Sequence, residues 1–202
     1  MKKVIVTTLI AVIVMGIYIA GKSISVYNEI IALDEGVKAQ WAQVENTYQR
    51  RFDLVPNLVA TVQGEADFEK STLSAVIDAR SKMGGTIKVD ENMLGDEAAM
   101  KRFQDMQAGL GGALQRLMVV TENYPSLQSN TSFQDLRVQL EGTENRIAVE
   151  RMRYNDFVKQ YNTIIRQFPN SLIAGFAGAS PKVAFSADAG ASSAPSVKFD
   201  TK

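Results

Sequence analysis

The side chains of this chain that could do chemistry are carboxylates, arginines and lysines, because it contains no histidine and no cysteine. Within these 202 residues the two absences exclude a thiolate nucleophile, a disulfide, a Cys/His zinc site, a histidine or cysteine haem ligand and a histidine-based triad. They also exclude the Glu-x-x-His motifs of di-iron helix bundles. Asp, Glu, Ser or Lys chemistry stays open, but no convergent set of these residues is evident. We therefore expect no enzymatic activity and no cofactor.

Three charged residues interrupt the apolar patterns of the sequence at positions where another aliphatic residue is expected. They are Arg51, Glu69 and Arg151. One interpretation is a partly buried ion-pair network that fixes how the helices align. The other places the three charges at the edge of the apolar stripe, with their ends in water. A catalytic role is disfavoured, because structural networks also contain perturbed charges.

A group of acidic residues offers the oxygen ligands that a hard cation prefers. Its members are Glu141, Glu144 and Glu150, together with Asn145. Interleaved arginines at 146, 151 and 153 neutralise the local charge, so salt bridges such as Arg146 with Glu150 are the better interpretation. We predict structural ion pairs here and no metal.

The glycines of Gly109-Leu-Gly111-Gly112 lack the Lys-Ser/Thr that follows in a phosphate-binding loop. Small residues in the middle of a helix each cost about 1 kcal/mol relative to alanine, which favours a packing purpose. The pattern therefore predicts the close approach of a neighbouring element.

A proline and three charges interrupt the helical pattern at residues 50–57, Arg-Arg-Phe-Asp-Leu-Val-Pro-Asn. Pro56 removes a helical hydrogen bond and disfavours α geometry at the residue before it, and Asp53 is a good N-cap. This pattern predicts a turn between two helices, with a kinked continuous helix as the alternative. We expect the turn to lie at the membrane-distal end and to offer a polar partner-binding surface. That surface comprises Arg50, Arg51, Asp53 and Asn57.

The elements that position these residues begin with an uncharged segment from Val4 to Gly21. Eighteen residues are near the lower limit for a membrane-spanning helix. A cleaved signal peptide shares the basic start, but Tyr18 fits a small-x-small cleavage site before Ala20 poorly. We therefore interpret residues 1–24 as a retained single-pass anchor. Lysines before the span and acidity after it place the N-terminus in the cytoplasm and the remainder outside.

The remainder of the chain is predicted to be helical, since apolar residues recur at steps of three and four. The four runs cover residues 30–48, 55–83, 99–124 and 133–168. Each run has one apolar stripe, so each helix needs partners. We predict an all-α fold in which residues 25–176 form a long up-down-up-down four-helix bundle with coiled-coil-like packing. Basic and acidic residues balance at 22 each, so nucleic acid is not an expected partner.

Three apolar residues at helical spacing follow Phe168-Pro169, where the fourth helix is expected to end. Leu172, Ile173 and Phe176 are spaced as in an amphipathic segment at a membrane interface. The alternative is that they cap the base of the bundle. Either interpretation places them near the bilayer.

Residues 177–202 form an extended tail that contains the pattern Pro-x-Val-x-Phe twice. Pro181-Lys-Val-Ala-Phe185 is echoed by Pro195-Ser-Val-Lys-Phe199, with Val183, Phe185, Val197 and Phe199 at matching positions. Both copies alternate apolar and polar residues, which is typical of strands that add to a sheet edge of a partner. The alternative is a disordered tail with a chance repeat.

Four long stretches resemble the LemA family. They are LDEGVKAQWAQVENTYQRRFDLVPNLVATVQG (33–64), STLSAVIDARSK (71–82), TENYPSLQSNTSFQDL (121–136) and LEGTENRIAVERMRYNDFVKQYNTIIRQFPNSLIAGF (140–176). The resemblance extends from the anchor to about Phe185. It implies a bacterial membrane protein with one N-terminal span, a four-helix bundle and no established catalytic residues. The family usually has a second aromatic residue soon after IAGF, whereas Ala177-Gly178-Ala179 follows here.

The resemblance also hints at a partner role, because family members are often encoded beside membrane proteases or other envelope proteins. We expect a non-enzymatic, membrane-anchored helical scaffold or partner-binding protein of the bacterial inner membrane. Its expected partners are membrane lipid, further copies of itself and an envelope protein. The alternatives are an accessory subunit of a membrane enzyme, such as an envelope protease, and a membrane-shaping protein.

Overall fold

A computed structural model describes residues 1–65, 68–84 and 91–186 of the chain. The secondary structure assigned to these residues is helical, without strands, so the all-α prediction is confirmed for them. In chain order the elements are α1 (Lys2–Gln63), α2 (Lys70–Ser81), the 3-10 helix η1 (Glu91–Gly95), α3 (Glu97–Thr121), α4 (Pro125–Gln128), α5 (Thr131–Arg166) and α6 (Asn170–Phe176).

The first helix is a single element of 62 residues that passes through Pro56. The predicted turn at residues 50–57 is therefore wrong, and the alternative of a continuous helix is correct. Asp53 does not cap a new helix, because its carboxylate accepts a hydrogen bond from Gln49 Nε2 at 2.7 Å, one turn earlier. The partner-binding surface predicted for a turn does not lie at a helix end.

Burial explains why the chain stays helical at the proline. The stripe of buried residues continues past it, through Leu58, Val59 and Val62, while the proline itself is exposed. A proline in a helix interior costs about 3 kcal/mol. Burying each apolar side chain beyond it contributes roughly 1.5–3 kcal/mol, so the three together outweigh that cost. The apolar run predicted for 55–83 is accordingly divided between α1 and α2.

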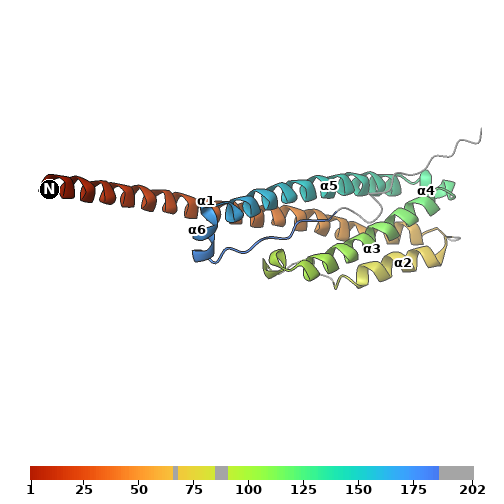
Figure 1. Ribbon diagram of the computed structural model, residues 1–202. Helices are drawn as coiled ribbons and strands as arrows, with labels where there is room; N and C mark the ends of the chain where they lie inside the picture. Colours follow the sequence, from red (N-terminus) through yellow and green to blue (C-terminus); the bar gives the residue numbers. More distant parts are fainter. Residues whose placement is uncertain (66–67, 85–90, 187–202) are drawn as a thin grey trace, which may run out of the picture.

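The chain reverses direction between successive long helices (Figure 1). From the projecting N-terminus α1 runs to the far end, α2 returns, α3 runs out again, and α5 returns along α1. The most extensive packing is between α1 and α5, and α2 packs on α3 and on α1. We call the packed region from Ile30 to Arg166 the body. Its end beside α6 is the base, and its end beside α4 is the tip.

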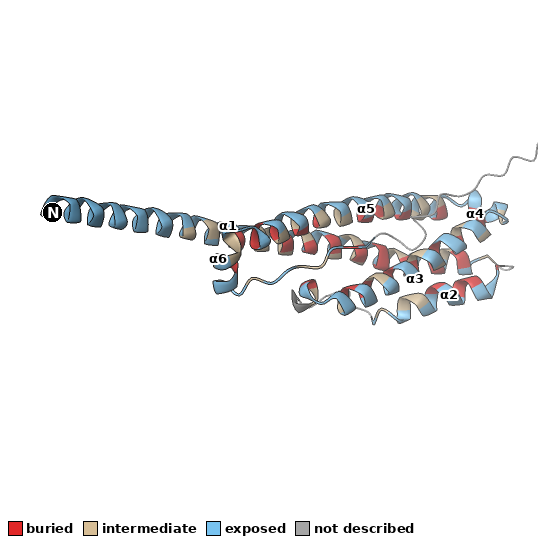
Figure 2. Cartoon of the chain, in the orientation of Figure 1, coloured by how far each residue is buried: buried red, intermediate tan, exposed pale blue. Residues whose placement is uncertain are grey.

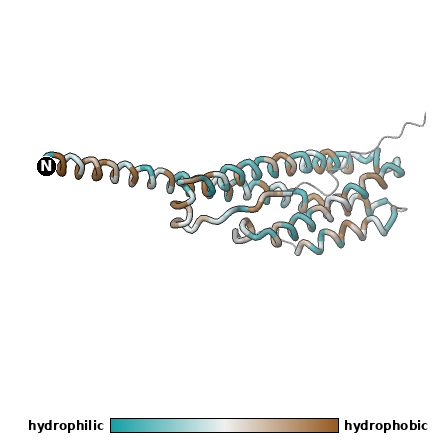
Figure 3. Tube along the Cα trace, in the orientation of Figure 1, coloured by the Kyte–Doolittle hydropathy of each residue, from teal (hydrophilic) through white to brown (hydrophobic). Residues whose placement is uncertain are grey.

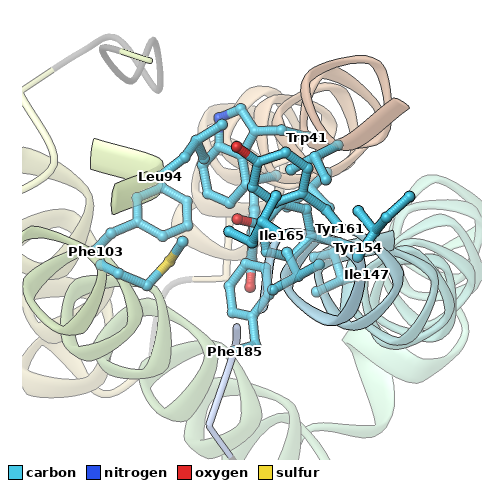
Figure 4. Close-up of a cluster of buried hydrophobic side chains, with 14 of the residues drawn as sticks. Trp41, Leu94, Phe103, Ile147, Tyr154, Tyr161, Ile165 and Phe185 are labelled. Carbon is cyan, nitrogen blue, oxygen red and sulfur yellow. The ribbon is translucent and has the colours of Figure 1, made fainter. Parts of the chain in front are cut away.

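Buried side chains form two clusters on the inner faces of the helices (Figure 2). The proximal core, nearer the base, is aromatic and includes Trp41, Phe103 and Tyr154 (Figure 4). The distal core is mainly aliphatic and includes Val62 and Leu117. Each cluster draws on α1, so this one helix contributes to the core along the whole length of the body.

The continuity of α1 predicts that replacing Pro56 with alanine stabilises the protein. Alanine restores a helical N–H and removes the ring clash, which should raise the free energy of unfolding by about 1–3 kcal/mol. Urea denaturation of the two purified proteins, followed by circular dichroism, measures the difference. Ala60→Gly, an exposed change in the same helix, is the control and should lower stability by about 1 kcal/mol. A loss of stability on Pro56→Ala would contradict a helical conformation at this site.

Candidate functional site

The projecting part of α1 is apolar and lies outside the packed body. Its side chains are exposed, for example Val4 at 67% and Ile17 at 68%, and Figure 3 shows hydrophobic residues along it. Of the helices in the described part of the chain, α1 alone is long and apolar enough to cross a membrane, with a mean hydropathy of 2.5 over its most apolar window. No part of that window is buried. A bilayer would supply the apolar surroundings that the protein itself does not.

A groove lies where this apolar segment meets the body. It has a volume of about 740 Å³ and lies between α1 and α6. Its lining includes Tyr18, Ile19 and Lys22 of α1, and Leu172, Ile173 and Phe176 of α6. Because Tyr18 belongs to the uncharged segment, the groove begins at the level where that segment ends. We call it the base groove.

The three predicted membrane-proximal residues differ in their surroundings. Ile173 is half-buried and packs against the proximal core. Leu172 and Phe176 are 60% and 95% exposed and line the base groove. Ile173 therefore fits the interpretation of a cap at the base. Leu172 and Phe176 present an apolar surface, as the interpretation of a membrane-interface segment requires.

Arg51 is buried at the junction of three helices. Its side chain on α1 is 4% exposed, and Nη1 lies 3.2 Å from both carboxylate oxygens of Glu144 on α5. Nη2 donates to the backbone carbonyl of Gln107 on α3 at 3.0 Å and also to the side-chain oxygen of that residue. The guanidinium stacks over the Tyr48 ring at 5.0 Å. Arg51 is thus placed to hold the helices together, and it is not accessible to a partner.

Among the three glycines predicted to allow a close approach, Gly111 on α3 is the one beside Arg51. A Cβ at position 111 would lie 3.4 Å from Arg51 Nη1, whereas a Cβ at Gly109 or Gly112 would meet nothing within 4 Å. A distance of 3.4 Å is an ordinary van der Waals contact, so the structure does not show the predicted close approach at these three glycines.

The other residues predicted to form ion pairs are dispersed. Glu150 pairs with Arg153 at 2.8 Å and accepts a hydrogen bond from Gln40 Nε2 at 2.6 Å. The structure thus pairs this glutamate with the arginine three positions on, where the sequence suggested Arg146 four positions before. Glu69 accepts a hydrogen bond from the hydroxyl of nearby Ser71. No set of three acidic side chains converges on a metal-sized site within residues 1–65, 68–84 and 91–186.

Arg50 lies on the outer side of α1, where it helps to line a polar groove against α5. The groove has a volume of about 570 Å³, and its lining also includes Arg146, Arg153 and Glu150. Asp53 and Asn57 are exposed on the same helix. Of the four residues predicted to bind a partner, three are accessible and Arg51 is not.

The tail runs as an extended chain over the body, in contact with η1, α3 and α5. Two asparagines of α5 each bind one residue of the tail through both of its backbone groups. Asn162 accepts from the Lys182 N–H at 2.9 Å and donates to the Lys182 carbonyl at 2.8 Å. Asn155 does the same for Phe185, at 2.8 and 3.1 Å. We call residues 181–185 the strap and the surface beneath them the strap groove.

The strap is also held through Val183 and Phe185. The Val183 N–H donates to the Leu94 carbonyl at 2.7 Å, and its carbonyl accepts from the Tyr154 hydroxyl at 3.0 Å. Phe185 is 6% exposed and stacks on Trp41, with ring centroids 5.8 Å apart (Figure 4). The backbone groups of the strap bind to side chains and to one carbonyl of η1, so the predicted addition to a sheet edge does not describe this contact. The matching residues Val197 and Phe199 lie outside the described residues.

Lys182 forms an ion pair with Asp34 on α1, with Nζ and Oδ1 2.8 Å apart. Burial alone would raise the pKa of Asp34, but hydrogen bonds and charge from Lys182 and Lys38 outweigh it and hold that pKa below its ordinary value. Glu35 also faces Lys38, at 3.0 Å, and Tyr161 lies beneath Lys182. Burial is the main cause of a raised pKa at Tyr161.

The sequence analysis missed the two asparagines that bind the strap. A signal is present, because Tyr154-Asn155 and Tyr161-Asn162 are the same dipeptide seven residues apart. Such spacing returns to the same helix face after two turns.

The buried position of Arg51 predicts a large loss of stability on Arg51→Ala. The change removes a charge-assisted contact and leaves polar atoms of Gln107 buried without their donor, which should cost about 2–4 kcal/mol. Arg50→Ala, the exposed neighbour, should change stability by no more than about 0.5 kcal/mol. Denaturant unfolding of the two variants provides the comparison. Equal effects would show that Arg51 does not join the helices.

The Asp34–Lys182 pair predicts that acid weakens the hold on the strap. A carboxylate whose pKa is lower in the folded state stabilises that state above its unfolded pKa, here about 3.8, and this contribution disappears as the pH falls through the folded value. The stability difference between the natural protein and Asp34→Asn should therefore be present at pH 6 and vanish progressively below about pH 4.

Trp41, the one tryptophan of the chain, stacks on the strap and reports its attachment by fluorescence during unfolding at each pH. Lys182→Gln is the control, because it removes the strap side of the pair and leaves Lys38 in place. A difference between the natural protein and Asp34→Asn that persists unchanged at pH 2.5 would contradict this assignment.

Comparisons with known proteins found similar sequences. The family model of the LemA family matches residues 40–199. Three curated relatives are each 31% identical to the chain: magnetosome proteins MamQ 1 and MamQ 2 of Paramagnetospirillum magneticum, over 171 residues, and magnetosome protein MamQ of Magnetospirillum gryphiswaldense, over 167. The matches cover 75% of this chain and 61% of each relative, so the chain spans less than two thirds of their length.

The family model covers well over half of the chain, and its match includes Arg51, Glu144 and both asparagines of the strap groove. The apolar projection of α1 precedes the matched region and continues into it without a break. The chain is therefore a membrane-associated helical protein that belongs to the LemA family.

Proposed function

We propose that the protein is a non-enzymatic, single-pass membrane-anchored scaffold that holds a helical body at a fixed height above the bilayer and binds a protein partner there. Residues 25–176, which include the body, serve in this proposal as an up-down-up-down four-helix bundle. The observation that carries the proposal is the continuity of α1 from the exposed apolar projection to the tip. A helix of 62 residues is about 93 Å long, so anchor and body are parts of one rigid element.

The base groove supports the proposed orientation of the body. Leu172 and Phe176 project beside Tyr18 and Lys22, at the level where the apolar segment ends. Aromatic residues and lysines favour this depth in a bilayer, where an apolar ring meets lipid and an ammonium meets head groups. In our proposal these two α6 residues contact lipid, while Ile173 joins them to the proximal core.

The body lies on the extracytoplasmic side of the inner membrane in this proposal. Lys2 and Lys3 precede the span, while Glu29, Asp34 and Glu35 follow it after Lys22. The positive-inside rule favours cytoplasmic retention of the end with the greater positive charge.

The proposed partner surface is the polar groove between α1 and α5. Arg50 and Arg146 are exposed there, beside the Arg153–Glu150 pair, and Asp53 and Asn57 continue the polar surface along α1. Guanidinium groups in this arrangement suit an acidic protein segment, which they can bind through paired hydrogen bonds. Arg51 is excluded from this surface by its burial.

Assembly into homo-oligomers is part of the proposal. An anchor confines all copies to one surface and raises their effective concentration, so weak contacts between bodies suffice.

Cysteine labelling tests the proposed side of the membrane, because the natural chain contains no cysteine. Ser132→Cys places one thiol on an exposed position at the tip. A membrane-impermeant maleimide should label it in intact spheroplasts to the same extent as after lysis. A cysteine inserted after Met1 is the matched control, and only lysis should allow its labelling. The reverse pattern for the two thiols would contradict the proposed topology.

A further inference from the structure

The strap groove repeats one recognition unit along α5. Each unit is a tyrosine followed by an asparagine, first Tyr154-Asn155 and then Tyr161-Asn162. Seven residues of helix advance about 10.5 Å, and three residues of extended chain advance about 10 Å. The two asparagines therefore match the backbone of residues three apart in an extended peptide. The strap runs opposite to α5, so that Lys182 meets Asn162 and Phe185 meets Asn155.

The groove binds some residues of the strap through their backbone and others through their side chains. The second and fifth residues are bound through their backbones, which any residue except proline can offer. The third, Val183, is partly buried against the proximal core, and the fifth, Phe185, enters the aromatic pocket formed by Trp41 and Tyr154. The fourth, Ala184, is exposed. The groove thus selects valine and phenylalanine two residues apart and leaves the position between them free.

The second copy of the pattern, Pro195-Ser-Val-Lys-Phe199, satisfies these requirements. It keeps proline, valine and phenylalanine at the first, third and fifth positions. Its lysine falls at the fourth position, where the strap residue is exposed. The difference that matters is at the second position, where serine replaces Lys182 and cannot form the ion pair with Asp34.

We propose that the strap groove is a binding site for extended peptides of the pattern Pro-x-Val-x-Phe, and that residues 195–199 of the same chain are its second ligand, in exchange with residues 181–185. Two segments of one chain then compete for one site. The ion pair between Lys182 and Asp34 makes the first copy the resident ligand. Exchange releases the strap from its groove and makes it available to other proteins.

Chain length favours exchange within one molecule. When residues 181–185 occupy the groove, residues 177–180 connect them to α6. When residues 195–199 occupy the groove, residues 177–194 form the connection. Eighteen residues can span any distance that four span, since an extended chain advances about 3.3 Å per residue. A tethered ligand also has an effective concentration in the millimolar range, which a free peptide or a neighbouring chain must exceed.

Peptide binding to the full-length protein in detergent tests the site itself. The probe is a fluorescent peptide of residues 193–202, Ser-Ala-Pro-Ser-Val-Lys-Phe-Asp-Thr-Lys. The protein carries Phe185→Ala and Phe199→Ala, so that neither internal copy fills the aromatic pocket. Fluorescence anisotropy should show saturable binding, and alanine in place of the probe's phenylalanine should weaken it about tenfold or more.

Two matched peptides test how the groove reads its ligand. In the protein that carries Phe185→Ala and Phe199→Ala and keeps Asp34, unlabelled Pro-Lys-Val-Ala-Phe should displace the probe better than Pro-Ser-Val-Lys-Phe. When Asp34→Asn is added to that protein, the two peptides should displace the probe equally well. Lysine in place of alanine at the fourth position should leave competition unchanged. Absence of probe binding, or equal binding of the phenylalanine-to-alanine probe, would overturn the proposal.

Comparison of Phe185→Ala with the double variant tests which chain supplies the second ligand. In Phe185→Ala alone, Phe199 should restore the Trp41 fluorescence of the natural protein, and adding Phe199→Ala should abolish that recovery. Recovery should be independent of protein concentration. Recovery that increases with concentration would assign the ligand to a neighbouring copy and overturn exchange within one chain.

Circular dichroism and the thermal unfolding transition establish that these variants are folded. If Phe185→Ala unfolds the body, Lys182→Gln replaces it, because this change weakens the strap without emptying the core. The probe should then displace the strap from Lys182→Gln at a lower concentration than from the natural protein. Equal concentrations for the two proteins would also overturn the proposal.

Discussion

The continuity of α1 through Pro56 is the constraint on which the rest of the structure depends. Because the helix does not end there, a single element contains the apolar projection, the α1 wall of the base groove and part of both cores. The proline's lost hydrogen bond is local, whereas the compensating burial extends over two further turns of the helix. A break at Pro56 would move the residues after it, including Leu58 and Val62, out of the line of the projection and shorten the body.

Arg51 shows how charge is used inside this framework. It lies between three helices, with a half-exposed carboxylate on one side and a backbone carbonyl on the other. A buried guanidinium without these partners would be strongly destabilising, so the site favours the one alignment of helices that supplies both. The arginine of α1 thus contacts both α3 and α5, while its neighbour Arg50 is exposed.

Local pattern was sufficient to predict the features that local physics controls. The uncharged segment, the apolar stripes and the rhythm of Leu172, Ile173 and Phe176 follow from helical period and composition alone. Whether the helix continues through Pro56 could not be predicted in this way, because this depends on burial against residues far away in the sequence. The partners of Arg51 could not be predicted either, because they depend on which helices face each other. The strap required the spacing of two tyrosine-asparagine pairs to be compared with the rise of an extended chain.

The distance between spin labels on either side of Pro56 tests the continuity of α1 most directly. Ala39 and Gln63 are exposed, and the chain has no cysteine, so cysteines introduced at these two positions are labelled alone. Twenty-four residues of continuous helix separate their Cα atoms by about 36 Å, and a kink at the proline shortens this by only a few ångströms. Pulsed electron spin resonance on the protein in lipid nanodiscs should give a single distribution above about 30 Å, from the helical rise. A distribution centred near about 15 Å, as expected when a second helix returns beside the first, would contradict the account.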